Sequence, residues 1–219
     1  LAARRPGCRF LLPIAPTTSA AALERFAGST NPIAAAYTSG IARLEPPTEQ
    51  CPWRRLITTA GTEIHLQEDP PAHGPLSQCA LALTTVGANT AELGALGVPM
   101  IVIVPTQHLG VMQAWDGWLG LLARLPGLRW CIGALLSAWR LRNHGFLAWP
   151  NISAGRAVVP ERVGALQPEA IAAEADDWLA SPSRLHGQRN DLRSLRGQPG
   201  AVAALANEVR SLLPRTLAD

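Results

Sequence analysis

The chain has 219 residues, of which 47% are hydrophobic and only 16% are charged, and its formal net charge is +3. A chain of this length can bury a large core, and no apolar run reaches the roughly 18 residues that a membrane-spanning helix needs. All nineteen basic residues are arginines, which excludes a Walker-A lysine and a Schiff-base lysine from this chain. Because the arginines are scattered and the net charge is small, we expect no nucleic-acid partner.

The cysteines and histidines give no sign of a metal site. The four cysteines show no C-x-x-C spacing, and the five histidines are equally dispersed. We therefore expect reduced thiols in a cytoplasmic protein, with no metal and no other cofactor. The sequence does not begin with Met, and we expect that an upstream part is missing from it.

The first elements alternate between strand and helix patterns. The apolar run Cys8–Ile14 predicts a strand, and Thr17 is placed to cap a helix that ends at Gly28. Residues 31–52 are rich in Pro, Thr and Ser, which predicts a loop.

A hairpin and a rigid loop come next in the chain. Residues 56–59 predict a strand, and residues 63–67 predict its hairpin partner. The segment 69–75 contains three prolines and predicts a rigid loop. Within this loop, His73 is either a ligand contact or, as is commoner, a solvated histidine.

Residues 81–105 predict the unit around which the rest of the chain is organised. Residues 81–85 form a short β-prone run, Gly87 permits a sharp turn, and Gly97 ends the helix that follows. Residues 100–104 are an uninterrupted apolar run, typical of a strand that is covered on both faces. The pattern predicts a βαβ unit in a parallel, Rossmann-like sheet, and therefore an α/β fold.

Polar residues gather at the start of the helix in this unit. Ligands of parallel sheets bind at the carboxyl ends of the strands, which is where Gly87, Asn89, Thr90 and Glu92 cluster. We expect Asn89 or Thr90 to cap the helix and Glu92 to lie in its first turn. A helix N-terminus attracts anions, whereas a carboxylate accepts hydrogen bonds from hydroxyl groups. The combination favours a ligand that carries both phosphate and hydroxyl groups, such as a nucleotide.

The stretch 106–143 predicts two apolar helices that form an inserted hairpin. It is rich in leucine and arginine and holds four of the seven tryptophans. Trp and Arg beside an apolar face are typical of an element that lies on a membrane surface. We therefore expect peripheral contact with the cytoplasmic face of a membrane. The alternative is a hairpin packed on the core or on another domain.

The segment that follows carries two further candidate residues. Residues 146–150 predict a short strand that ends at Pro150, after which Asn151 opens a tight turn. In a parallel sheet, this places Asn151 and Arg156 near the same edge as Glu92. The amide of Asn151 can bind a base or a phosphate, and Arg156 can pair with a diphosphate. The alternatives are that Asn151 only forms the turn and that Arg156 only makes a surface salt bridge.

Residues 167–219 predict a series of helices that begin at Pro168, at Pro182 and after Gly200. The last of them is amphipathic and suits packing on a neighbouring domain as well as on its own sheet. We divide the chain into an α/β domain, residues 1–166, that contains the 106–143 insertion, and a set of C-terminal helices, residues 167–219.

Two segments together resemble one known family, the lipid-A-disaccharide synthases, which are glycosyltransferases of the GT-B fold. The chain is similar to their C-terminal half in A-L-T-T-V-G-A-N-T-A-E-L-G-A-L-G-V-P-M and in L-A-W-P-N-I-S-A-G-R-A-V-V-P-E. The first family pattern is matched by Gly87, Glu92 and Pro99. The later P-N-x-x-A-G-R motif is matched by Pro150, Asn151, Ala154, Gly155 and Arg156.

The resemblance implies roles for these residues. By this resemblance, Glu92 holds the ribose hydroxyls, and Asn151 and the 87–90 turn contact uridine or diphosphate. Arg156 either contacts the diphosphate or braces its loop. The family usually has Ser-Gly-Thr where this chain has Val86-Gly87-Ala88. The family's acceptor site lies in an N-terminal domain that has no counterpart in this sequence. We therefore expect no catalytic residue in this chain, and no transfer by this chain alone.

The resemblance predicts the UDP-sugar-binding part of a hexosyltransferase that acts on a lipid or glycolipid acceptor. The alternative is a non-catalytic relative that binds a membrane or a partner protein through residues 106–143. A sugar-nucleotide epimerase is a third possibility, and it needs acid–base groups for which His73 and Glu68 are the candidates.

Overall fold

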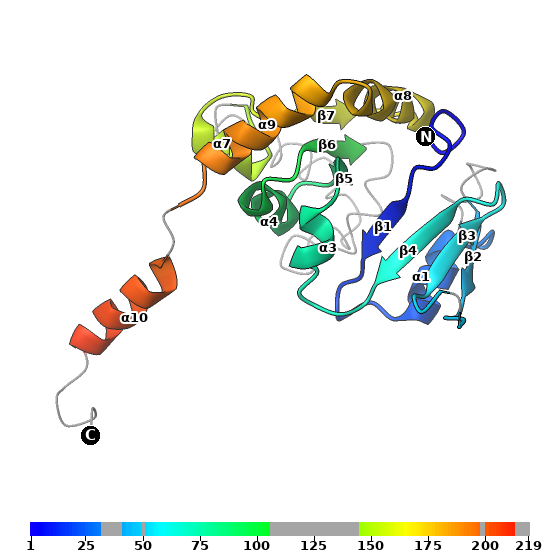
Figure 1. The fold of residues 1–219 in the computed structure, drawn as a ribbon, viewed down its shortest axis with the longest axis horizontal. Coiled ribbons are helices and arrows are strands. Elements are labelled where there is room, and N and C mark those ends of the chain that lie inside the picture. Colours follow the sequence, from blue (N-terminus) through cyan, green and yellow to red (C-terminus); the bar gives the residue numbers. More distant parts are fainter. Residues whose placement is uncertain (32–40, 50, 106–144, 198–199, 213–219) are drawn as a thin grey trace, which may run out of the picture.

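The computed structural model describes residues 1–31, 41–49, 51–105, 145–197 and 200–212. Within these ranges the strands form two sheets, one of four strands and one of three, with helices packed against both (Figure 1). The predicted α/β fold with a parallel sheet is confirmed. The predicted hairpin at 106–143 lies outside the described residues.

The four-stranded sheet has the order β1-β4-β3-β2. Strands β1 (Phe10–Pro13) and β4 (Glu63–Gln67) pair in parallel, whereas β3 (Arg55–Thr58) is antiparallel to both β4 and β2 (Ala42–Glu45). The predicted hairpin of β3 and β4 is thus confirmed. The predicted loop at 31–52 is wrong in part, because it contains β2.

Helix α1 (Ala20–Ala27) covers one face of this sheet. Its residues Leu23 and Ala27 pack against a small core that is made by Ala42, Leu56 and Leu66. The helix starts later than predicted, because Ser19 and not Thr17 is its N-cap. The Ser19 hydroxyl accepts a hydrogen bond from the N–H of Ala22, which satisfies one of the free amides of the first turn.

The three-stranded sheet is entirely parallel. It has the order β5 (Ala82–Thr84), β6 (Met100–Pro105) and β7 (Glu161–Gly164). Helix α4 (Ala88–Leu96) connects β5 to β6, so the predicted βαβ unit is confirmed. Met100, Ile101 and Val102 of the central strand are 0% exposed, as expected for a strand covered on both faces.

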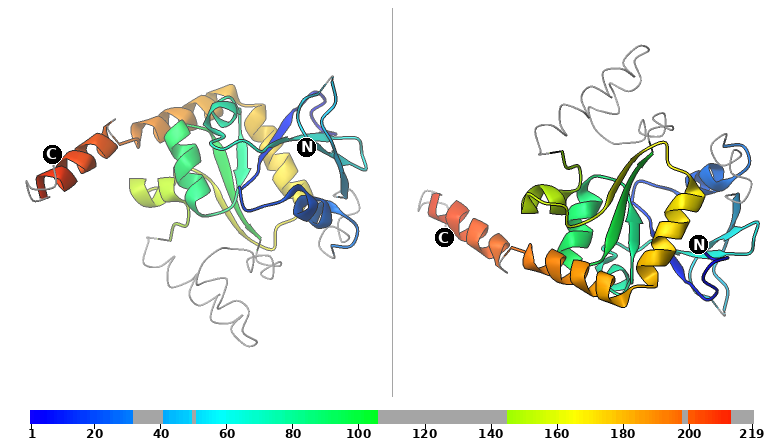
Figure 2. Two further views of the ribbon diagram at one scale, coloured as in Figure 1. Left: turned by 90° about the horizontal axis from the view of Figure 1, so that it is seen from below. Right: turned by 90° about the horizontal axis from the view of Figure 1, so that it is seen from above.

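The alternation of side chains along β6 divides the core between two layers of helix. Met100 and Val102 pack in one cluster with Leu93 of α4 and Leu192 of α9 (Pro182–Ser194). On the opposite face, Ile101 packs with two residues of α8 (Pro168–Leu179), Ala175 and Trp178. Figure 2 shows α4 and α8 on the two sides of the strands. Helices α8 and α9 begin at Pro168 and Pro182, as the sequence predicts.

Gly97 ends α4 where the chain must turn tightly beside another helix. Its φ of 68° is in the left-handed region, and its N–H closes the last helical turn on Gly94 and Leu93. A Cβ at this position would lie 3.0 Å from Cγ of Arg193 on α9. Glycine thus serves both the turn and the close approach of α9.

Helix α10 (Ala201–Leu212) extends away from the remainder of the molecule (Figures 1 and 2). Its predicted start is confirmed, and its apolar residues Val202, Leu205, Val209 and Leu212 are exposed. Of the helices in the described residues, none has the length and the apolar character needed to cross a membrane. The division into domains at residue 166 stays a prediction.

A buried glutamine connects α9 to the three-stranded sheet. Gln188 is 4% exposed; its side-chain oxygen accepts from the N–H of Met100 at 2.7 Å, and its amide donates to the carbonyl of Val158 at 3.1 Å. These two backbone groups are shielded from water, so they depend on Gln188 for a hydrogen-bond partner.

We expect Gln188→Ala to lower the free energy of unfolding by about 2 to 4 kcal/mol, since it leaves two buried backbone groups without partners. Urea denaturation measures this loss. Gln78→Ala is the matched control, because Gln78 is exposed at the end of α3 (His73–Ser77). Equal effects of the two substitutions would contradict the role given to Gln188.

Candidate functional site

The candidate site is built on the turn between β5 and α4. Gly87 occupies this turn with a φ of 134°, a conformation that side chains rarely adopt, and it is the N-cap of α4. The predicted cap at Asn89 or Thr90 is therefore wrong, because both residues lie within the helix. Glu92 lies beyond the first turn rather than in it. The turn nevertheless brings the start of α4 to the carboxyl end of β5, as the sequence predicts.

The residues of this turn differ in their exposure. Gly87, Asn89 and Glu92 are exposed, whereas Thr90 is completely buried. The Thr90 hydroxyl donates to the carbonyl of Gly87 at 2.8 Å, so it stabilises the turn from inside. Because Gly87 has no side chain with which to cap the helix, the exposed start of α4 can present its first amides to an anion.

The predicted strand at 146–150 is wrong. Residues Trp149–Ala154 form helix α7, in which Pro150 lies in the first turn, where a missing N–H costs nothing. The strand of this region is β7, which begins only at Glu161. Asn151 therefore lies in a helix, and the segment that contains Arg156 leads to the amino end of β7.

Asn151 is 1% exposed, and its side-chain amide is fully engaged within the protein. Its oxygen accepts from the N–H groups of Val158 and Val159, at 2.7 and 2.8 Å. Its nitrogen donates to the carbonyl of Val159 at 2.9 Å and to the carboxylate of Glu161 at 2.8 Å. The amide thus fixes the loop after α7 to the helix itself.

Glu161 is a residue that the sequence reasoning missed. Besides Asn151, its carboxylate accepts from the N–H groups of Leu147 and Ala148, which lead into α7. The signal available was a single glutamate after Pro160, which has no characteristic spacing. Its importance becomes visible only when the chain folds back on α7.

One hydrogen bond joins this network to the turn at Gly87. The N–H of Trp149, the first residue of α7, donates to the Thr90 hydroxyl at 3.2 Å. Pro150 packs against α4, where a Cβ at Gly94 would lie 3.3 Å from its Cγ. The two segments singled out by the sequence are therefore in contact, through Thr90 and α7.

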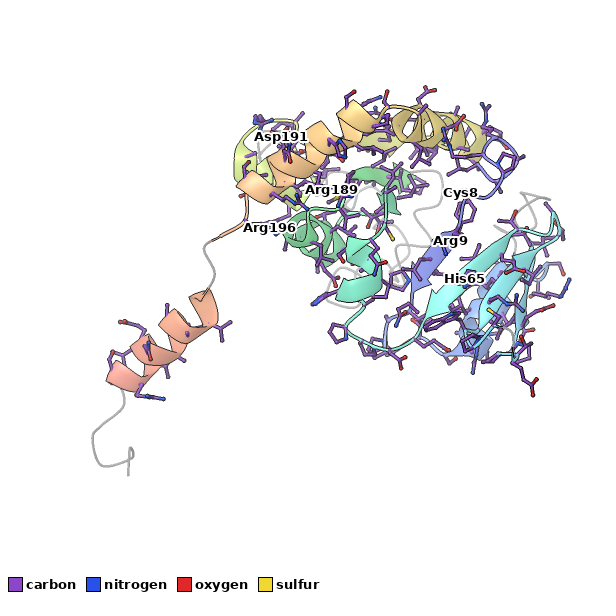
Figure 3. All side chains as sticks on the ribbon, in the orientation of Figure 1. Cys8, Arg9, His65, Arg189, Asp191 and Arg196 are labelled. Atoms are coloured by element: carbon purple, nitrogen blue, oxygen red, sulfur yellow. The ribbon has the colours of Figure 1, made fainter. Side chains whose placement is uncertain are left out.

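The two charged candidates, Arg156 and Glu92, each have a side-chain partner. The guanidinium of Arg156 is exposed and pairs with Asp191 at 3.0 Å. Asp191 lies on α9 (Figure 3). The carboxylate of Glu92 pairs with the imidazole of His73 on α3, with 3.1 Å between Oε1 and Nε2. His73 begins a short helix and is not in the extended loop that the sequence predicts.

Comparison with known proteins gives the same family as the two motifs. No protein-family model matches the chain. A lipid-A-disaccharide synthase of Anaeromyxobacter sp. (strain K) is 27% identical over 217 residues, which cover 97% of this chain and 43% of that protein. The synthase of Syntrophus aciditrophicus (strain SB) is 28% identical over 185 residues, or 76% of this chain and 42% of that protein.

This chain is similar in sequence to lipid-A-disaccharide synthases. The resemblance predicted from the two motifs is thus confirmed. The chain spans less than half the length of the curated synthases that it matches.

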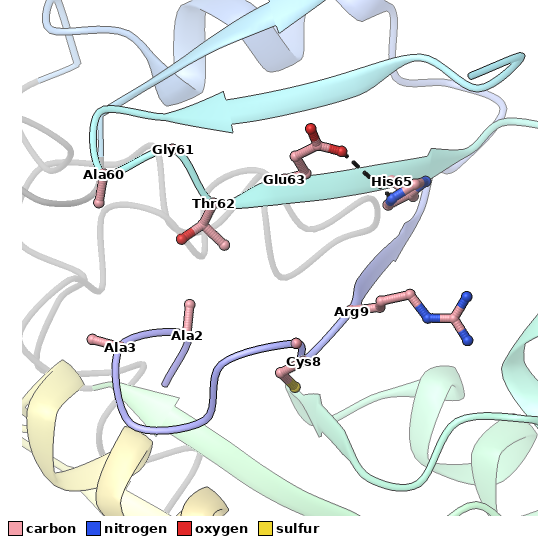
Figure 4. Close-up of a pocket in the computed structure, with 10 residues that line it drawn as sticks. Ala2, Ala3, Cys8, Arg9, Ala60, Gly61, Thr62, Glu63 and His65 are labelled. Atoms are coloured by element: carbon pink, nitrogen blue, oxygen red, sulfur yellow. Dashed lines mark ion pairs between the residues drawn. The ribbon is translucent and has the colours of Figure 1, made fainter. Parts of the chain in front are cut away.

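A cavity in the described part of the chain lies elsewhere. It has a volume of about 530 Å³ and opens at the amino ends of β1 and β4, between Cys8 and the turn at Gly61 (Figure 4). Glu63 and His65 line it, 4.0 Å apart. This cavity lies beside the four-stranded sheet, whereas the motif site belongs to the three-stranded sheet, so the two are separate candidate sites. The cavity is at the amino ends of its strands, whereas ligands of parallel sheets usually bind at the carboxyl ends.

Two side chains, Arg55 and Cys79, have raised pKa values. A hydrogen bond from Arg55 to Glu63 raises the pKa of Arg55, against a smaller opposing effect of burial, and burial raises the pKa of the Cys79 thiol. Among the residues described by the structure, no group of three His, Cys, Asp or Glu side chains could hold a metal ion.

We expect Asn151→Ala to lower the free energy of unfolding by about 3 to 5 kcal/mol, because it strands two buried N–H groups and a carbonyl. Chemical denaturation measures this change. The control is Asn207→Ala on the exposed face of α10, which we expect to change stability by less than about 0.5 kcal/mol. A stable Asn151→Ala protein would show that the amide is not a structural group.

Proposed function

We propose that this chain is the UDP-sugar-binding part of a hexosyltransferase of the GT-B fold. The observation that carries the proposal is the exposed start of α4 at the carboxyl end of β5, with Glu92 one turn further along. Kinship with lipid-A-disaccharide synthases supports a nucleotide-sugar donor and a lipid-linked sugar acceptor.

In this proposal, the diphosphate lies at the first amides of α4, near Gly87 and Asn89. Backbone N–H groups and the helix dipole favour a negative charge there. The ribose hydroxyls donate to the carboxylate of Glu92. Arg156 contributes a positive charge for the diphosphate. To do so, its guanidinium must leave Asp191 and pair with the ligand instead.

Thr90 and Asn151 belong to the same proposed site but act from beneath it. Their polar atoms bind the backbone of the turn, of α7 and of the following loop. We therefore assign them to holding the nucleotide-binding surface in shape. We expect replacement of Asn151 to weaken UDP binding through the loss of this structure.

The contribution to transfer is positional and electrostatic. Fixing UDP against helix amides and an arginine stabilises the charge that develops on the diphosphate as the sugar leaves. The acceptor site and the groups that move protons are assigned to a separate part of the enzyme. A lipid-linked acceptor also requires peripheral contact with a membrane, for which residues 106–143 are the proposed element.

The direct test is calorimetric titration of the 219-residue chain with UDP. We expect a dissociation constant on the order of 1 mM or below, and a loss of at least about tenfold in affinity for Glu92→Ala. Glu208→Ala on exposed α10 is the matched control and should bind as the unaltered chain does. Failure of the unaltered chain to bind UDP, or equal losses for Glu92→Ala and Glu208→Ala, would contradict the proposal.

The second candidate function is binding of a membrane or a partner protein by a non-catalytic relative. One observation among the described residues favours it: Val202, Leu205, Val209 and Leu212 of α10 are between 51% and 83% exposed and recur at helical spacing. Co-sedimentation with lipid vesicles, together with absence of UDP binding, would favour this function over the first.

A further inference from the structure

The contact between the imidazole of His73 and the carboxylate of Glu92 joins two helices, α3 and α4, at the proposed nucleotide site. Helices α3 and α4 pack through Leu76 and Leu93, which are buried in the same cluster. The position of His73 is therefore set by a short helix that is anchored in the core. Its Nε2 lies 3.1 Å from Oε1 of Glu92.

This contact limits the freedom of a side chain that is otherwise mobile. Glu92 is 43% exposed at its side chain, and a free glutamate must lose much of its rotamer entropy when it binds a ligand. A carboxylate that is already held by an imidazole has lost part of that freedom beforehand. Because His73 contacts Oε1, the second oxygen, Oε2, is the acceptor best placed for a further donor.

We propose that His73 is a positioning residue that orients Glu92 for the ribose hydroxyls and so sets the preference for ribose over deoxyribose. The inference rests on the proposed function, which assigns the ribose to Glu92. A ribonucleotide offers two hydroxyl donors to the carboxylate, whereas a 2′-deoxyribonucleotide offers one. The preference therefore depends on how well the carboxylate is held in place.

The role can be separated from a contribution to folding. Both partners are partly exposed, at 56% and 43% of their side chains, and exposed ion pairs add little to stability. We therefore expect His73 variants to fold. His65 provides a matched control, because it faces Glu63 at 4.0 Å on β4, within the other sheet.

The test measures the dissociation constants of UDP and 2′-deoxy-UDP by calorimetry and compares their ratio between variants of the full chain. We expect His73→Ala to reduce the preference for UDP by about 3- to 10-fold, towards the ratio of Glu92→Ala. His73→Gln should retain most of the preference, because its amide nitrogen can reach Oε1 as Nε2 does. His65→Ala should leave the ratio unchanged, and His73→Ala should have no further effect on the ratio in the Glu92→Ala protein.

The outcomes distinguish this inference from the proposed function. If Glu92→Ala abolishes the preference and His73→Ala does not, the inference is wrong and the proposed function stands. If His73→Ala weakens both ligands equally, the residue has only a structural role, and the inference is again overturned. If the chain does not bind UDP, or Glu92→Ala leaves the ratio unchanged, the proposed function fails and the inference fails with it.

Discussion

The hydrogen bonds of Asn151 and Glu161 are the constraint on which the site depends. Together they satisfy backbone groups that lead into α7 and in the loop that leaves it, and they join both segments to Glu161 at the start of β7. From α7, the N–H of Trp149 reaches Thr90, whose hydroxyl in turn fixes the carbonyl of Gly87. The conformation of an exposed turn thus depends on polar groups beneath it, of which Thr90 and Asn151 are buried.

This arrangement divides the motif residues into two kinds. Thr90 and Asn151 are buried and occupied by backbone partners, whereas Asn89, Glu92 and Arg156 are exposed. Matching a family motif therefore does not mean that each residue touches a ligand. A substitution at a buried motif position tests the stability of the scaffold, and a substitution at an exposed one tests binding.

The sequence predicts the parts of this fold that are encoded locally. The apolar run of β6 and the glycine that ends α4 identify the βαβ unit, because burial on both faces and a left-handed turn each leave a clear signal. The short apolar run before Pro150 leaves no such clear signal, because four or five apolar residues suit a buried helix as well as a strand. The pairing of β2, the carboxylate of Glu161 and the contact of His73 with Glu92 all depend on residues that meet only in the folded chain.

The central claim is that the carboxyl end of β5 and the start of α4 bind the nucleotide. Hydrogen exchange of the backbone amides, followed by mass spectrometry with and without UDP, tests it most directly because it locates binding along the chain. The account predicts slower exchange in a peptide that covers residues 85–92 and unchanged exchange around the cavity at residues 60–65. Slower exchange at 60–65, with unchanged exchange at 85–92, would contradict the account and place the ligand at the cavity beside the four-stranded sheet.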